Sequence, residues 1–157
     1  LRQALSPEGD SVTYRDRSLH IVTWAQKFLF RSDQLDTPVK NLSGGEKARI
    51  LIADLMRQPA DILLLDEPTN DLDIPSLQVL EESLLEFSGS VVLVTHDRFL
   101  LNRVCDVVLG FDGKGTVTAF ADHEQWYSFL RDQEKKATKE AAAPKQKQGR
   151  KKAGRLS

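Results

Sequence analysis

Residues 41–73 read NLSGGEKARILIADLMRQPADILLLDEPTNDLD, and this stretch decides the fold. Ser43 and Glu46 have the S-x-x-E spacing of a capping box, which predicts that a helix begins at Ser43. Gln58 and Pro59 end this helix. The continuous apolar run at 62–65 then predicts a strand buried on both faces of a parallel sheet. A helix followed by such a strand indicates an α/β fold.

The residues that follow this strand predict a helix and then a second strand parallel to the first. Asp73 is a good N-cap for a helix over 74–87, whose apolar side would be formed by Leu77, Leu80, Leu84 and Leu85. A second apolar strand follows at 91–94. The strand–helix–strand order predicts a right-handed crossover, so both strands would end at the same edge of the sheet. Ligands bind beyond the carboxyl ends of strands in open α/β sheets.

Gly44 and Gly45 fill the first two positions of the predicted helix. Glycine there destabilises a helix by up to ~1 kcal/mol relative to Ala. Without Cβ atoms, however, the backbone N–H groups at a helix N-terminus approach a phosphate closely, and the Ser43 hydroxyl adds a donor. Taken alone, the turn favours a plain N-cap, with a phosphate site as the alternative interpretation.

Two acids and a histidine meet at the predicted ligand edge. Asp66 and Glu67 end the first strand and would repel each other, and a divalent metal relieves that repulsion. Asp66 is the candidate Mg²⁺ ligand, while Glu67 would orient an attacking water or accept its proton. His96, after the second strand, would lie near them. The alternatives are a solvated acid pair, a structural histidine, and a nucleophile pair of Cys105 with His96.

Composition separates an acidic body from a basic tail. Residues 1–130 hold 12 Lys/Arg against 20 Asp/Glu, whereas residues 131–157 hold 10 against 3. We predict one domain over 1–130 and a disordered linker over 131–157, with helix permitted before Pro144. The basic residues would contact nucleic acid phosphates or serve as a solvated linker. The single cysteine and the short apolar runs predict a cytoplasmic protein without a membrane span.

The flanking segments predict further elements. Residues 1–18 suggest a loop or short hairpin, and residues 19–30 have apolar positions at helical spacing. Asp112-Gly113-Lys114-Gly115 lies between two apolar runs and predicts a hairpin over 107–120. Residues 123–131 then predict a helix.

The order LSGGE, ILLLDEP, TNDLD and THDR resembles the second half of an ATP-binding cassette nucleotide-binding domain. Residues 42–46 match the signature motif, 62–67 match Walker B with the catalytic glutamate, and 70–73 match the D-loop. The resemblance implies a partial domain of the P-loop NTPase-like fold, with a helical subdomain and the C-terminal half of the sheet. It implies catalytic roles for Glu67 and His96 and metal binding by Asp66. It also implies ATP-binding roles for Ser43, Gly44, Gly45, Glu46 and Asp71.

DEPTNDLD is similar to the ABC-F branch of the family, and FDGKGTVTAF is similar to the second cassette of its Uup type. This resemblance implies an ATPase that uses ATP and Mg²⁺, pairs with a first cassette in the same polypeptide, and acts on ribosomes, DNA or RNA. An ATP-binding subunit of a transporter is the alternative. The sequence has no G-x-x-x-x-G-K-[ST] loop, so we expect a C-terminal fragment of a longer protein that is inactive alone.

Overall fold

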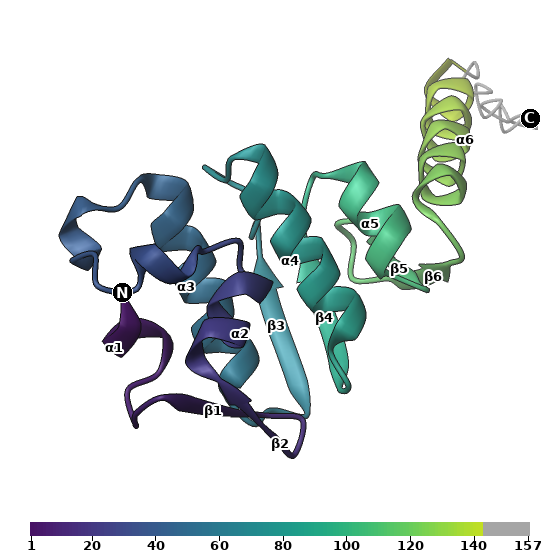
Figure 1. Cartoon of the computed structure of the whole chain (residues 1–157). Helices are drawn as coiled ribbons and strands as arrows, with labels where there is room; N and C mark the ends of the chain where they lie inside the picture. The colour runs from purple at the N-terminus through teal and green to yellow at the C-terminus, as the bar shows by residue number, and fades with distance from the viewer. Residues whose placement is uncertain (143–157) are drawn as a thin grey trace, which may run out of the picture.

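The computed structural model of the chain describes residues 1–142 (Figure 1). Six α-helices occur in this part of the chain: α1 (Arg2–Leu5), α2 (Ile21–Lys27), α3 (Gly44–Arg57), α4 (Ile74–Glu86), α5 (Arg98–Val104) and α6 (His123–Ala142). The 3-10 turns are η1 (Ser32–Gln34) and η2 (Val39–Asn41). The strands are β1 (Ser11–Tyr14), β2 (Arg17–His20), β3 (Ile62–Asp66), β4 (Ser90–Val94), β5 (Val108–Phe111) and β6 (Val117–Phe120).

Side-chain caps fix the starts of the helices that follow the site motifs. Ser43 and Glu46 form the predicted capping box of α3. Asp73 caps α4, because its Oδ1 accepts a hydrogen bond from the Ser76 backbone N–H at 2.9 Å. Asp97 caps α5 in the same way, through the backbone N–H groups of Phe99 and Leu100. These caps satisfy donors that have no partner inside a helix.

The parallel pair β3–β4 is confirmed, with Leu63 opposite Val91 and Asp66 opposite Val94. The prediction that β3 is buried on both faces is wrong in this structure. Leu63 is 6% exposed and belongs to the core cluster, whereas Leu64, its neighbour on the other face, is 72% exposed. Successive side chains of a strand point to opposite faces, and α3 and α4 supply core residues to one face alone.

The core lies between the N-terminal elements and the helices α3 and α4 (Figure 1). Trp24 is fully buried, with its ring centroid 4.8 Å from that of Phe28 and 5.0 Å from that of Tyr14. The buried side of α4 differs from the prediction. Leu80 and Leu84 are buried as expected, but Leu85 is 52% exposed. Three residues complete the buried face: Ser76, Val79 and Ser83.

The C-terminal elements form a separate layer in which α6 extends away from the core (Figure 1). The predicted hairpin is present as the antiparallel pair β5–β6, and residues 1–18 also contain a hairpin, β1–β2. Helix α6 continues to Ala142, so it extends beyond the predicted end at residue 131 into the segment where helix was permitted before Pro144. Ala, Lys and Glu have high helix propensity, which accounts for this extension. The predicted disorder of 143–157 lies outside the described residues.

No helix in residues 1–142 is both long enough and apolar enough to cross a bilayer.

Trp24→Ala should lower the free energy of unfolding of the chain by about 3–5 kcal/mol, because it removes a fully buried aromatic ring and leaves a cavity. Chemical denaturation measures the change. Leu51→Ala is the control, since Leu51 is 71% exposed on α3. An equal loss in both variants would show that Trp24 is not a core residue.

Candidate nucleotide site

The turn that begins α3 is held by reciprocal hydrogen bonds. The Glu46 backbone N–H donates to Ser43 Oγ at 3.2 Å, and the Ser43 backbone N–H donates to Glu46 Oε2 at 2.8 Å. Gln34 Nε2 donates to the other carboxylate oxygen, Oε1, at 3.1 Å. The hydrogen bond from the Ser43 backbone is the main cause that lowers the pKa of Glu46 below its ordinary value. Glu46 therefore shapes the turn, while the exposed Ser43 hydroxyl keeps its own proton for another acceptor.

The two glycines of the turn have different surroundings. A Cβ atom on Gly44 would meet no heavy atom within 4 Å, so the backbone there is open to a ligand. A Cβ atom on Gly45 would instead overlap the carboxylate of Asp73. Close packing against the start of α4 thus requires glycine at position 45, whereas access to the backbone is the reason that remains for glycine at position 44.

The carboxyl ends of β3 and β4 bring Glu67 and His96 together, as the topology predicts. The backbone N–H of Glu67 donates to the Val94 carbonyl at 2.7 Å, which ties the end of β3 to β4. Glu67 Oε1 lies 3.5 Å from His96 Nε2, and Glu67 Oε2 accepts weak hydrogen bonds from Thr95 Oγ1 at 3.5 Å and from the His96 backbone N–H at 3.4 Å.

The backbone of Glu67 is strained, with φ at +45° in a region that non-glycine residues rarely adopt. The Glu67 side chain is 25% exposed, whereas the His96 side chain is fully exposed. One oxygen of the glutamate is therefore oriented by the end of β4, and the other faces a histidine that solvent or a ligand reaches freely.

The carboxylates of Asp66 and Asp71 make no hydrogen bond or ion pair with Glu67 or His96 among the described residues. Asp66 is exposed at the end of β3, and Asp71 is exposed in the turn before α4 with φ at +63°. Within residues 1–142, neither carboxylate makes a side-chain hydrogen bond or ion pair, and no group of three or more His, Cys, Asp or Glu side chains gathers around a metal position. A single exposed carboxylate beside phosphates nevertheless suits Mg²⁺, which keeps several waters and takes one or two protein ligands.

The site is open. A shallow hollow of the described surface is lined by residues 26 and 29–33, and none of the motif residues lies on it. Ser43 is exposed and the Glu67 side chain is 25% exposed, so a nucleotide at either residue would contact the molecular surface.

Cys105 does not resemble an activated nucleophile. It is partly buried, and this burial is the main cause that raises the pKa of its thiol. A raised pKa disfavours the reactive thiolate. The pairing of Cys105 with His96 considered above therefore has no electrostatic support.

Comparison with known proteins places these motifs in one family. A profile of the family described as ABC transporter matches residues 3–70. The ATP-binding protein Uup of Caulobacter vibrioides is 44% identical over 109 residues, covering 69% of this chain and 18% of that protein. Uup of Escherichia coli is 37% identical over 160 residues, covering 98% of this chain and 25% of that protein. The chain belongs to the ATP-binding cassette family, in its Uup-like ABC-F branch.

A solved structure agrees with this assignment. An archaeal ribosome recycling factor, in complex with the archaeal ribosomal stalk protein, matches with a TM-score of 0.50 and 27% identity over 69% of this chain and 23% of that chain. The chain has the fold of a partial ATP-binding cassette domain. It spans roughly a fifth to a quarter of the length of the Uup relatives.

Three residues that contact the motif positions in the structure were not predicted as site residues from the sequence. Thr95 Oγ1 lies against Glu67, while Arg49 and Ser76 lie between the starts of α3 and α4. Thr95 precedes His96 directly, so its place at the strand end could have identified it. Arg49 and Ser76 are 27 residues apart, and no spacing rule connects them.

Stability should fall in acid partly through Glu46. Its pKa is lowered in the folded state, so its contribution is present above the unfolded value of about 4.3 and is lost as pH falls through the folded value. Glu46→Gln keeps an acceptor without the titration. Urea denaturation of this variant between pH 5 and pH 3 should show a smaller decline than wild type. An unchanged decline would exclude the capping box as a source of the pH dependence.

Proposed function

We propose that this chain forms part of an ATPase with two cassettes, and that it contributes to two ATP sites. The pairing of Glu67 with His96 at the carboxyl ends of β3 and β4 carries the proposal. In ABC dimers, ATP lies between the Walker A motif of one cassette and the signature motif of the other. Asp66, Glu67 and His96 would then serve ATP held by this cassette, whereas the turn at Ser43 would serve ATP held by the first cassette.

Each side chain has a distinct proposed role. Glu67 would orient the attacking water and accept its proton, since its carboxylate is directed by Thr95 and by the His96 backbone. The fully exposed His96 side chain is free to contact the γ-phosphate. Asp66 would hold Mg²⁺, which neutralises phosphate charge when bound. The exposed backbone at Gly44 and the Ser43 hydroxyl would donate to phosphate oxygens, and Asp71 would take part in ATP binding.

We also propose that the protein works in the cytoplasm on a ribosome or on nucleic acid, through its basic C-terminal region. Residues 131–157 carry 10 Lys/Arg against 3 Asp/Glu. Lys135 and Lys136 are exposed on α6, which extends away from the core in Figure 1. The likeness to a ribosome recycling factor supports a ribosomal partner. Closure around ATP would change the surface that this region presents, and hydrolysis would reset it.

In the intact protein, Glu67→Gln should lower ATP turnover by about a hundredfold or more while ATP affinity is kept, because general-base catalysis is lost without a change in phosphate contacts. Turnover and nucleotide binding are measured separately on the same preparation. Glu82→Gln is a matched control, since Glu82 is exposed on α4.

Two outcomes would contradict the role assigned to Glu67. One is an equal loss of turnover and affinity in Glu67→Gln, and the other is a similar loss of turnover in Glu82→Gln.

The 157-residue chain alone should show neither tight ATP binding nor turnover, because its sequence has no G-x-x-x-x-G-K-[ST] loop. If the isolated chain hydrolyses ATP and Glu67→Gln abolishes that activity, the proposal that each ATP site needs a motif from outside this chain is refuted.

Removing the charge of the basic region should weaken binding to RNA, DNA or ribosomes in a salt-dependent way. Replacement of the ten Lys/Arg of 131–157 by Gln in the intact protein should reduce the slope of log affinity against log salt, because fewer counterions are released. Filter binding at several salt concentrations measures the slope. An unchanged slope for all three ligands would assign the region to a solvated linker.

A further inference from the structure

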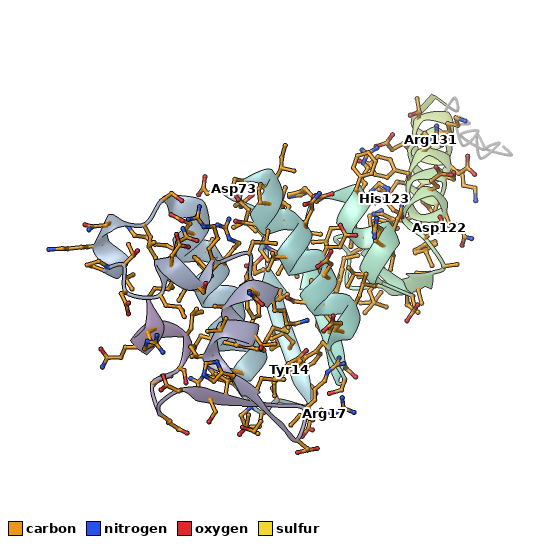
Figure 2. The ribbon with its side chains drawn as sticks, viewed as in Figure 1. Tyr14, Arg17, Asp73, Asp122, His123 and Arg131 are labelled. Carbon is orange, nitrogen blue, oxygen red and sulfur yellow. The ribbon has the colours of Figure 1, made fainter. Side chains whose placement is uncertain are left out.

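A buried polar cluster joins the first turn of α3 to the first turn of α4. Ser76 Oγ donates a hydrogen bond to the Gly45 carbonyl at 3.0 Å and accepts one from Arg49 Nη1 at 3.3 Å. Arg49 Nη1 also lies 3.7 Å from Asp73 Oδ1, and the guanidinium lies over the Phe30 ring, 5.3 Å from its centroid. Asp73, at the start of α4 on the side toward α3 in Figure 2, occupies the space beside Gly45.

Burial makes this cluster costly to disturb. Arg49 is 8% exposed and Ser76 is fully buried. Within residues 1–142, the Nε atom of Arg49 has no hydrogen-bond partner, so few contacts hold the buried charge in place. Loss of the Ser76 hydroxyl would remove one of these contacts and also the hydrogen bond that links the Gly45 carbonyl to α4.

The cluster connects the two groups of motif residues. Gly45 belongs to the turn that begins at Ser43, and Asp73 ends the turn that follows Glu67 directly. That second turn is held by the Asn70 backbone N–H donating to the Glu67 carbonyl at 3.2 Å, and by the Leu72 N–H donating to the Thr69 carbonyl at 3.3 Å. A displacement of the start of α3 would thus be transmitted to the turn beside Glu67.

We propose that Arg49 and Ser76 are positioning residues that make the turn at Ser43 and the turn ending at Asp73 move as one unit. The inference rests on the proposed function, in which these turns serve two different ATP molecules. Under that function, the arrival of one cassette's ATP at Ser43 fixes the position of the turn that follows the catalytic Glu67. Arg49 and Ser76 touch neither nucleotide and act through Gly45 and Asp73.

Ser76→Ala in the intact protein tests this inference. Because positioning matters for the reacting geometry, kcat should fall about tenfold or more while KM for ATP stays near the wild-type value. Arg49→Met should give a similar loss, and the double variant should lose no more than the larger single loss, since the two residues act as a unit. Losses that multiply would overturn the inference.

Ser83→Ala is the matched control, because Ser83 is also buried on α4 and, within residues 1–142, its side chain makes no hydrogen bond to α3. Ser76→Ala should unfold at a lower denaturant concentration than Ser83→Ala, because Ser76 alone of the two contacts the buried Arg49. The kcat values are therefore compared under conditions in which both variants are folded, and Ser83→Ala should keep the wild-type kcat. An equal kcat in the two variants would overturn this inference and leave the proposed function standing. If the wild-type protein shows no ATP turnover that Glu67→Gln abolishes, the proposed function itself is refuted. Should Ser76→Ala fail to fold, Ser76→Cys keeps the volume, weakens both hydrogen bonds and carries the same expectations.

Discussion

The contact between the first turns of α3 and α4 is the constraint on which the candidate site depends. Gly45 lies so close to the Asp73 carboxylate that any side chain at position 45 would displace it. Ser76 joins the two turns by a hydrogen bond to the Gly45 carbonyl, and Arg49 fills the remaining space beside Phe30. The position of the turn that begins at Ser43 is therefore linked to the turn that follows Glu67, although the two are far apart in the sequence.

A second constraint is the incomplete cover of the β3–β4 sheet. One face packs against the core, whereas the other presents exposed apolar side chains: Ile62, Leu64, Val92 and Val94. Apolar residues on both faces are typical of a sheet covered by helices on both sides. The described residues supply that cover on one side, which agrees with a chain that spans about a quarter of the length of its Escherichia coli relative.

Short-range sequence patterns predicted where helices begin more accurately than which of their side chains are buried. Caps at Ser43, Asp73 and Asp97 depend on short-range hydrogen bonds, and the starts of α3 and α4 were predicted correctly from them. The buried face of α4 was predicted less well, because the apolar residues of this helix lie on more than one of its sides. The side that contains Ser76 and Ser83 is the one that packs against the core. Those serines are buried through contacts with other segments, and helical periodicity contains no information about such contacts.

The sequence by itself determined the α/β class, the parallel pairing of β3 with β4 and the convergence of Glu67 with His96. Strand order and the handedness of a crossover are sufficient for these features, because they place the carboxyl ends of parallel strands at one edge. Only the tertiary structure decided that Gly44 and Gly45 have different reasons to be glycine, and that Arg49 and Ser76 connect the two turns. Such contacts depend on the distance between α3 and α4, which is set by the packing of the whole core rather than by any local pattern.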